Sequence, residues 1–285
     1  MRAPIASGLY FGEAPRWHAH ELWFSDIHGQ RVHRTALEGG RGDVREVLRL
    51  ADDLPSGLGW LPDGRLLVVA MDTQQLRRVE PDGTVVVHAD LSVVATGTLN
   101  DMVVGPDGTA YVGDTGWRMW VERREIVPGR LLVVSPAGET VQVVEGMMAP
   151  NGMTLLADRL VVAEPAASRL TAFCVAGDGT LADRRPFAEL DALKPVAPDG
   201  ICGDAEGAVW LADPVGRRVV RVRDGGAVTD VLDFAERPVA CVLAGTDRRT
   251  LAVCVAPDWH REAVLRAPLA RIEVFDVPVS GAGTP

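Results

Sequence analysis

The sequence predicts an all-β protein, a single six-bladed β-propeller that spans residues 1–285. The main observation is a phrase that recurs six times: a tight turn, an apolar strand, an acidic or small residue, and a second strand ending in basic residues. Successive counterpart positions lie 45, 43, 50, 49 and 43 residues apart, namely Asp26, Met71, Asp114, Glu164, Asp213 and Ala256. A period of about 40–50 residues built from short strands is typical of a β-propeller.

The second observation is a regular supply of turn residues between the apolar runs. Pro-Asp-Gly triplets begin at residues 62, 81 and 106, and Asp-Gly pairs begin at residues 178 and 224. Proline fixes φ, aspartate caps the turn and glycine accepts a positive φ, so these segments are expected to be hairpin connections. No segment keeps a helical period over three turns, and only residues 191–198 are expected to hold a short helical turn.

The two ends of the chain are expected to share one blade. The segments PIASGLYFG, near the N-terminus, and ARIEVFDVPV, near the C-terminus, both have the composition of strands. Pairing them would close the ring and remove the open edges that a sheet otherwise presents. No shift in composition and no low-complexity linker divides the chain, which favours one domain.

Composition and charge disfavour several classes of partner. The chain has 29 basic and 39 acidic residues, a net charge of −10, and no basic stripe, so nucleic-acid binding is not expected. No apolar run suits a signal peptide or a membrane span, which predicts a soluble, cytoplasmic protein, either a monomer or a homo-oligomer. Four cysteines lie in apolar runs without paired spacing and are expected to be buried thiols: Cys174, Cys202, Cys241 and Cys254.

One connection is longer than its counterparts. Residues 115–130, TGWRMWVERREIVPGR, stand where other repeats have a short hairpin, and they include Trp117, Met119 and Trp120. Such an excursion could form a lid or a pocket wall. The alternative is a surface insertion that is packed by its own aromatic side chains.

Four short motifs bring polar residues to the beginnings of predicted inner strands. They are GEAPRW with Glu13, TLNDMVVGPDG with Asn100 and Asp101, APNGMTL with Asn151, and APDGICGDAEG with Asp199. In the last two, proline fixes the approach and glycine is expected to let the backbone turn tightly. Carboxylate and carboxamide oxygens suit a hard divalent cation such as Ca²⁺, whereas Zn²⁺ usually requires His or Cys. The alternative is that Asn-Gly and Asp-Gly are ordinary turn dipeptides.

The histidines do not have the spacing of a zinc site. His18 and His20 follow Trp17 and are expected in a solvated turn. His260 begins a loop of the last repeat that could reach the mouth of the propeller and contact a substrate. No Gly-X-Ser-X-Gly motif is present, so a Ser-His-Asp triad is not supported.

Over nearly its whole length the sequence resembles the SMP-30/gluconolactonase/luciferin-regenerating-enzyme-like family. The resemblance is carried by GEAPRW followed by LWFSDIHGQRVHR, by LNDMVVGPDGTAYVGD, by APNGMTL and by PDGICGDAEGAVWLAD. It implies a six-bladed propeller that carries one divalent metal ion at the channel mouth, with Ca²⁺ expected and Zn²⁺, Mn²⁺ or Mg²⁺ as alternatives. It also implies the hydrolysis of a lactone.

The resemblance also implies roles for particular residues. Glu13, Asn151 and Asp199 match the metal ligands, and Asn100 would lie beside the metal and touch the substrate. The metal would act as a Lewis acid on the ester carbonyl. Asp199 would also be the catalytic base that activates water.

One position departs from the family pattern. Sugar-lactone hydrolases of the family usually carry an arginine two residues before the asparagine that Asn100 matches, whereas this chain has Thr98. A short neutral side chain predicts a roomier and less polar pocket, and therefore a lactone less polar than a sugar aldonolactone. Met147 and Met148 are either further apolar walls or core packing. The expected substrate-contacting residues are Thr98, Asn100, Asp101 and Trp117.

Other functions remain compatible with these residues. A metal and carboxylates could serve the cyclisation, isomerisation or dehydration of a carbonyl substrate, or the hydrolysis of a phosphotriester, because fold alone does not determine chemistry. A propeller can also be a non-catalytic binding platform, but a platform does not require carboxylates at its mouth.

Overall fold

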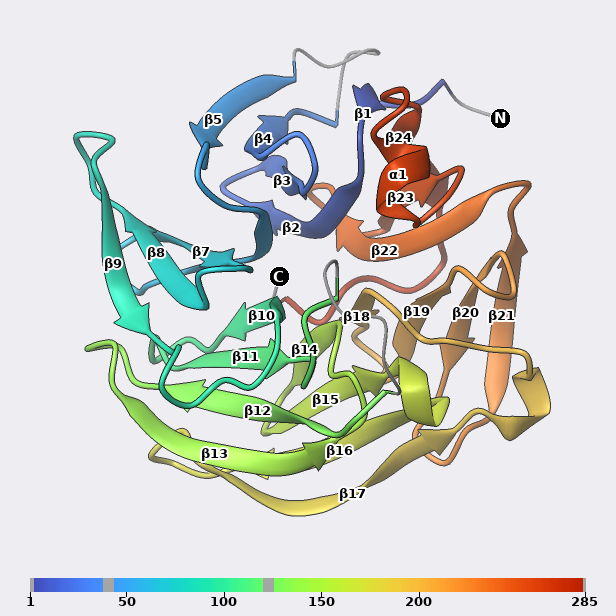
Figure 1. Ribbon diagram of the computed structural model, residues 1–285. Helices are drawn as coiled ribbons and strands as arrows, with labels where there is room; N and C mark the ends of the chain where they lie inside the picture. Colours follow the sequence, from blue (N-terminus) through green and yellow to red (C-terminus); the bar gives the residue numbers. More distant parts are fainter. Residues whose placement is uncertain (1–2, 38–43, 120–125, 284–285) are drawn as a thin grey trace.

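Six four-stranded antiparallel sheets form a ring around a common axis (Figure 1), which confirms the predicted six-bladed β-propeller. The computed structural model describes residues 3–37, 44–119 and 126–283. Each blade is a meander whose first strand lies nearest the axis. Neighbouring inner strands contact one another around the ring, and the inner strand of the last blade returns to that of the first.

Five blades follow the chain in order. Blade 1 consists of β2 (Gly12–His18), β3 (Glu21–Asp26), β4 (Arg31–Thr35) and β5 (Arg45–Arg49). Blade 2 consists of β6 (Pro55–Trp60), β7 (Leu66–Ala70), β8 (Gln75–Val79) and β9 (Val85–Asp90). Blade 3 consists of β10 (Leu99–Val104), β11 (Ala110–Asp114), β12 (Gly129–Val134) and β13 (Thr140–Met147). Blade 4 consists of β14 (Met153–Leu156), β15 (Arg159–Glu164), β16 (Arg169–Val175) and β17 (Leu181–Glu189). Blade 5 consists of β18 (Ile201–Gly203), β19 (Val209–Asp213), β20 (Arg218–Val222) and β21 (Val228–Asp233).

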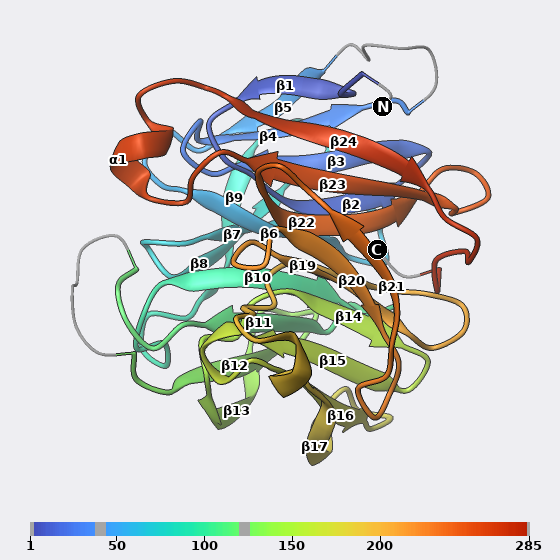
Figure 2. The same ribbon diagram turned by 90° about the vertical axis from the view of Figure 1, so that its right-hand side faces the viewer.

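The sixth blade joins the two ends of the chain, as predicted. It consists of β22 (Arg237–Ala244), β23 (Thr250–Ala256), β24 (Ala270–Asp276) and the N-terminal β1 (Ala6–Leu9). β1 pairs antiparallel with β24, with Ala6 opposite Ile272 (Figure 2). The outermost strand of this blade therefore comes from the opposite end of the chain, and this pairing closes the ring.

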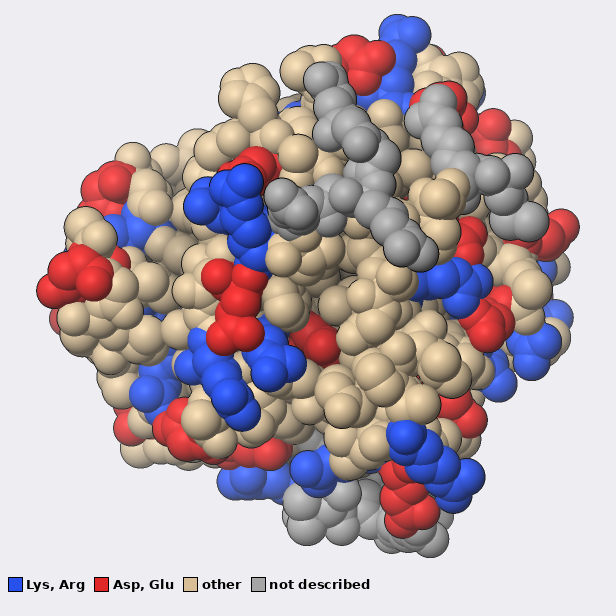
Figure 3. All heavy atoms as spheres, turned by 90° about the horizontal axis from the view of Figure 1, so that it is seen from above, with Lys and Arg blue, Asp and Glu red and all other residues tan. Residues whose placement is uncertain are grey.

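Over residues 3–37, 44–119 and 126–283, helical structure is confined to three short segments. They are the 3₁₀ turns η1 (Pro165–Ala167) and η2 (Asp191–Leu193) and the helix α1 (Arg261–Val264). η2 falls within residues 191–198, where a helical turn was expected. Among the described residues, no helix has the length and apolarity needed to cross a bilayer. On the side shown in Figure 3, the described basic and acidic side chains are interspersed and form no continuous basic stripe.

Aliphatic side chains fill the spaces between successive blades. Most second strands are buried along nearly their whole length, as in β7, where all five residues of LLVVA are buried. Such strands are covered by a neighbouring sheet on each face, so they lack the alternation of a half-exposed strand. Three cysteines are buried as expected, but the prediction is wrong for Cys174, which is exposed near the end of β16, beside a break in its register with β17.

The glycines of Ala-Pro-Asn-Gly and Ala-Pro-Asp-Gly serve close packing between blades, and the prediction that they permit tight turns is wrong. Neither Gly152 nor Gly200 adopts a positive φ. A Cβ atom at Gly152 would lie 2.5 Å from the carbonyl oxygen of Asp199 in the next blade. A Cβ atom at Gly200 would lie 2.4 Å from the Cβ atom of Ala240 in blade 6. The inner strands thus approach too closely for any larger residue.

The repeated acidic position is a buried anchor in four of the six blades. The acid ends the second strand, and its carboxylate accepts a hydrogen bond from a main-chain N–H of the segment that leads into the inner strand of the same blade. These anchoring carboxylates and their donors are Asp26 with Phe11 (2.8 Å), Asp114 with Gly97 (2.8 Å), Glu164 with Met148 (2.6 Å) and Asp213 with Ala197 (3.1 Å). All four side chains are at most 2% exposed.

The other two blades depart from this arrangement. In blade 2 the counterpart is Met71, and Asp53 of the preceding loop accepts main-chain N–H groups of Asp72 and Thr73 instead, at 2.8 and 2.9 Å. In blade 6 the counterpart is Ala256, which has no carboxylate. In blades 1, 3, 4 and 5, the repeated sequence motif thus supplies the same hydrogen bond between a buried carboxylate and a main-chain N–H group.

Candidate functional site

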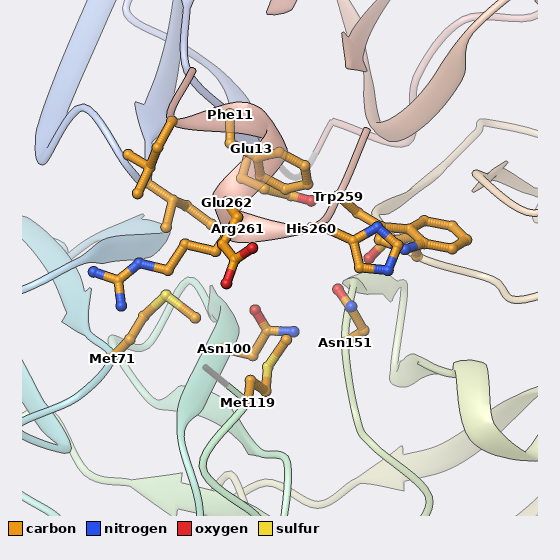
Figure 4. A pocket seen from close by; sticks show the side chains of 13 residues that line it. Phe11, Glu13, Met71, Asn100, Met119, Asn151, Trp259, His260, Arg261 and Glu262 are labelled. Carbon is orange, nitrogen blue, oxygen red and sulfur yellow. The ribbon is translucent and has the colours of Figure 1, made fainter. Parts of the chain in front are cut away.

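Four polar residues from four blades line one cavity of about 730 Å³ on the axis of the ring (Figure 4). They are Glu13, Asn100, Asn151 and Asp199, from blades 1, 3, 4 and 5. We call the end of the ring where these side chains lie the mouth. Residues separated by up to 186 positions in the sequence therefore meet, because the inner strands of all blades begin at the same end of the axis.

β-Bulges present two of these side chains. The register of β2 with β3 shifts between Glu13 and Arg16, and Ala14 within the bulge has a φ of +47°. The register of β10 with β11 shifts between Leu99 and Met102, around Asn100. A bulge bends its strand and redirects a side chain. Glu13 and Asn100 are consequently turned toward the mouth from strands that otherwise continue into the core.

Asn151 and Asp199 precede their inner strands. The main-chain N–H of Asn151 donates to the carbonyl oxygen of Ala163 (3.0 Å), and that of Asp199 donates to Ala212 (2.9 Å). The side chains of Asn151 and Asp199 are hydrogen-bonded to each other. Both residues are therefore held by main-chain pairing to the second strand of their own blade, although neither belongs to a regular strand.

Each mouth residue follows a segment that an anchoring carboxylate holds. The tethered N–H groups precede the mouth residues by two or three positions, as Phe11 precedes Glu13 and Ala197 precedes Asp199. Blades 2 and 6 do not have an anchor at the repeat position, and neither contributes to the set of four. The anchors thus position the mouth side chains from outside the cavity.

The two carboxylates of the mouth are electrostatically unfavourable as anions. Burial raises the pKa of Glu13 well above its usual range, and the nearby Asp199 raises it further. Burial, followed by the charge of Asp101, raises the pKa of Asp199 to about 8, although the hydrogen bond from Asn151 opposes this. Two desolvated carboxylates that repel one another require a proton or a cation between them.

The donor set fits a hard divalent cation. Two carboxylates and two carboxamides supply oxygen ligands only, which is the chemistry that Ca²⁺ prefers. Within the described residues, no group of three or more His, Cys, Asp and Glu side chains could hold a metal ion, so this candidate site depends on its two carboxamides as well as its two carboxylates. The raised pKa values of Glu13 and Asp199 independently favour a positive charge at this place.

Asp101 lies beneath the mouth and does not line the cavity. Its Oδ1 forms a salt bridge of 2.7 Å with Arg16, and the two side chains are only 6% and 3% exposed. Arg16 also donates to the carbonyl oxygens of Met102 (2.6 Å) and Leu58 (3.2 Å). The carboxylate expected to contact substrate is thus occupied by a buried arginine. A basic residue inside GEAPRW, in an inner strand, was the sequence feature that could have indicated this pair.

The SMP-30/Gluconolactonase/LRE-like region matches residues 11–257 of this chain. The protein belongs to this family. Pentonolactonase XacC of Haloferax volcanii is 28% identical over 88% of this chain and 84% of its own length. The 6-deoxy-6-sulfogluconolactonase of Pseudomonas putida is 29% identical over 99% of this chain and 92% of its own. The crystal structure of a calcium-binding regucalcin of Agrobacterium tumefaciens superposes with a TM-score of 0.80 at 20% identity, over 100% and 96% of the two chains, which shows a shared fold.

Within this family framework, Thr98 supports the wall of the pocket and does not itself line the cavity. Thr98 is buried, its hydroxyl accepts the main-chain N–H of Met119 (3.1 Å), and its own N–H donates to the carbonyl oxygen of Trp117 (2.9 Å). The hydroxyl of Thr115 donates to the same carbonyl (2.8 Å). A segment of the chain itself covers Thr98, and direct contact between Thr98 and a substrate stays a prediction.

The segment held by Thr98 is the beginning of the long connection at residues 115–130. Trp117 and Met119 line a second cavity of about 300 Å³ that shares Asn100, Asn151 and Asp199 with the first. The described part of this connection thus forms a pocket wall. Trp120 and the rest of residues 120–125 lie outside the described residues, and the expectation of a lid there stays a prediction.

The second cavity is the apolar part of the mouth, and we call it the apolar lobe. Beyond the three shared polar residues and Thr115, all of its lining is apolar: Trp117, Met119, Ile126, Ala149, Pro165, Ala166, Ala197, Pro214, Val215 and Trp259. Met147 does not belong to it, since its side chain is fully buried in the core between blades 3 and 4. Sequence reasoning missed most of these residues, because they come from loops of four different blades.

The larger cavity has a different rim. Between β23 and β24, the segment that contains α1 contributes Trp259, His260, Arg261, Glu262 and Leu265 to it (Figure 4). His260 does reach the mouth. His20 is exposed in a turn as expected, but the prediction is wrong for His18, which ends β2 and stacks on Trp60 with 3.9 Å between ring centroids.

Proposed function

We propose that this protein is a metal-dependent hydrolase that opens a lactone less polar than a sugar aldonolactone. The observation that carries the proposal is the pair of desolvated carboxylates, Glu13 and Asp199, that face one cavity together with two carboxamides. A binding platform would have no need of two carboxylates in an environment that destabilises their charge. The relatives named pentonolactonase and 6-deoxy-6-sulfogluconolactonase support lactone hydrolysis, with a small molecule as the substrate.

One divalent cation, most suitably Ca²⁺, would be held by Glu13, Asn151 and Asp199, with Asn100 completing the set or orienting the substrate. When bound, such a cation supplies Lewis acidity toward an ester carbonyl. The same charge would offset the repulsion between Glu13 and Asp199, so that both carboxylates could remain ionised at neutral pH.

The chain's own residues would perform the proton transfer and the positioning. Asp199 would accept a proton from the water that attacks the carbonyl carbon, and its hydrogen bond to Asn151 would hold the carboxylate in place. Asn100 would donate a hydrogen bond from its amide nitrogen to an oxygen of the substrate. The apolar lobe would exclude bulk water from one side of the bound lactone and would thereby strengthen these polar contacts.

The polarity of the substrate is inferred from the wall next to Asn100. The family's sugar-lactone hydrolases usually place an arginine there, whereas Thr98 anchors Trp117 and Met119, which present apolar surface. Hydroxyl groups of an aldonolactone would lose hydrogen bonds with water in this lobe and gain few in return. An alkyl or aryl group would instead bury apolar surface.

The proposal is tested with metal-stripped protein that is titrated calorimetrically with Ca²⁺, Zn²⁺, Mn²⁺ and Mg²⁺. Hydrolysis of gluconolactone, δ-valerolactone and dihydrocoumarin is then assayed with each ion. Asp199→Asn is compared with Asp233→Asn, a control at an exposed position in β21. Cation-dependent hydrolysis that is lost only in Asp199→Asn is the expected result.

Each departure from that result has a definite meaning. Cation binding without hydrolysis would move the chemistry to another carbonyl reaction, such as isomerisation or dehydration. The absence of binding by all four ions would contradict the metal site and favour a binding platform. Turnover of gluconolactone equal to or better than that of the two less polar lactones would contradict the inferred substrate polarity.

A further inference from the structure

A second group able to transfer protons lies at the mouth, on the segment between β23 and β24. The Oδ1 atom of Asp258 accepts the main-chain N–H groups of Trp259 (2.7 Å) and His260 (2.9 Å). The same atom lies 2.7 Å from Nδ1 of the His260 imidazole. The family match ends at residue 257, so this pair belongs to a part of the chain outside the matched region.

The loop that carries the pair is held from two sides. The guanidinium carbon of Arg237 lies 4.1 Å from the ring centroid of Trp259, and Arg237 also donates to the carbonyl oxygen of Pro214 (2.8 Å). Trp259 forms part of both cavities and so separates the apolar lobe from the charged rim. His260 then begins α1 as its N-cap residue. The imidazole is thus presented by a loop with defined contacts.

The geometry of the pair determines which nitrogen faces the substrate. The bond to Asp258 places a hydrogen on Nδ1, which leaves Nε2 as the atom that exchanges a proton. The His260 side chain is 74% exposed, so it can be reprotonated by solvent after each turnover. It also lines the cavity of Glu13 and Asp199 (Figure 4). Arg261 and Glu262 of α1 line the same cavity, and Arg237 of β22 contacts the neighbouring Trp259.

Opening a lactone requires a proton donor as well as a base. The water oxygen forms a bond to the carbonyl carbon while its proton passes to a base, and the bond between that carbon and the ring oxygen then breaks with its electron pair on the ring oxygen. An alkoxide is a poor leaving group unless an acid protonates it. In the proposed function, Asp199 accepts the proton of the attacking water. The ring oxygen of the lactone still requires a proton donor.

We propose that His260 is a second catalytic residue, whose Nε2–H protonates the departing ring oxygen, and that Asp258 is its positioning residue. This inference rests on the proposed lactone hydrolysis. The imidazolium becomes a neutral imidazole as the new hydroxyl group forms, and it recovers a proton from solvent. The contact between Oδ1 of Asp258 and Nδ1 fixes the orientation of the imidazole ring, as in the base–orienter pairs of other hydrolases.

The decisive experiment compares two six-membered lactones that differ in the acidity of the leaving oxygen. Dihydrocoumarin releases a phenol, with a pKa of about 10 as for a tyrosine side chain, and scarcely needs an acid catalyst. δ-Valerolactone releases an alkanol, a far weaker acid. In His260→Gln we expect kcat for δ-valerolactone to fall by about 10²-fold or more, and kcat for dihydrocoumarin to change by only a few-fold.

Two further variants separate catalysis from structure. Asp258→Asn retains an oxygen that can accept the two main-chain N–H groups, but it loses the charge. Its kcat for δ-valerolactone should fall less than that of His260→Gln, and its kcat for dihydrocoumarin should again change less than its kcat for δ-valerolactone. His20→Asn is the control, because His20 is exposed at the far end of β2 with a φ of 64° that asparagine tolerates. Thermal unfolding and Ca²⁺ titration of all three variants should match the parent protein.

Three outcomes would overturn the inference. Equal losses for the two lactones in His260→Gln would show that the residue does not protonate the leaving group. A change in KM alone would reduce His260 to a binding contact. If the parent protein hydrolyses neither lactone with any of the four cations, the proposed function fails, and the role of His260 fails with it.

Discussion

Two sets of acidic side chains lie in the interior or at the half-buried mouth of this propeller, and their surroundings are opposite. The anchoring carboxylates Asp114 and Asp213 end second strands and accept several main-chain N–H groups each. The mouth carboxylates Glu13 and Asp199 lie only a few residues from tethered segments, but their pKa values are raised by burial and by other acids. Burial alone therefore does not distinguish a structural carboxylate from a functional one.

Glu164 shows how the anchors avoid the cost of burial. Burial by itself would raise its pKa, but hydrogen bonds from Arg169, Thr171 and the N–H of Met148 outweigh that effect and hold the pKa below its usual range. At the mouth, Glu13 accepts only the N–H of Ala14 (2.9 Å) among the hydrogen bonds found in the described residues. The number of hydrogen-bond donors around the carboxylate thus distinguishes the anchor Glu164 from the mouth residue Glu13.

The largest effect is expected at Asp199. Asp199→Asn removes the proposed base and a cation ligand, so kcat should fall by at least about 10³-fold. The same change should raise the melting temperature of the cation-free protein, because it removes an unfavourable buried charge. Steady-state kinetics and calorimetric unfolding in the presence of EDTA measure both effects. A lower melting temperature would place Asp199 among the anchors.

Arg16 is the counter-ion of a third kind of carboxylate, which lies beneath the mouth. Arg16→Met would leave Asp101 charged and buried without a partner, and breaking such a pair costs about 3–5 kcal/mol. Chemical denaturation measures the loss, and Arg16→Met combined with Asp101→Asn should recover part of it. Equal stability of the single and double variants would show that the pair contributes little.

Replacement of an anchoring carboxylate by its amide should lower the free energy of unfolding, whereas the same replacement of a mouth carboxylate should raise it. Asp114→Asn keeps the size of the side chain but weakens charge-assisted bonds from Thr96, Gly97 and Gly116, with an expected loss of about 1.5–3 kcal/mol. Urea unfolding of this variant beside Asp199→Asn tests the sign of both effects. Stabilisation by Asp114→Asn would remove the distinction between the two sets.

The stability of the cation-free protein should also depend on pH. Because the folded-state pKa of Asp199 is raised to about 8, the folded protein binds more protons than the unfolded chain between pH 4 and 8. Stability from this group is present below about pH 4, the ordinary pKa of aspartate, and is lost as the pH rises through about 8. In the presence of EDTA, the melting temperature should fall as the pH rises from about 4 to about 8. Added Ca²⁺ should offset this fall. A rise with pH in EDTA would contradict the raised pKa.

Part of the site could be predicted because its residues stand in local motifs. Glu13, Asn100, Asn151 and Asp199 each stand at or just before the beginning of an inner strand, and the repeat brings these beginnings to one end of the axis. Asp101 lies beneath the mouth although it follows Asn100 directly, because β10 contains a bulge that places neighbouring side chains in different surroundings. The covering of Thr98 could not be predicted, because the residues that cover it come from a loop 19–21 positions further along the chain.

The sequence by itself determined the number of blades, the closure of the ring, the oxygen character of the mouth and the family. These features follow from repeated local patterns, each of which is written in a few consecutive residues. Only the tertiary structure decided which carboxylates are satisfied and which are not, that Arg16 neutralises Asp101, and that Trp117, Trp259 and His260 share one mouth. The physical reason is that desolvation and hydrogen-bond partners depend on residues of other blades, which no local pattern specifies.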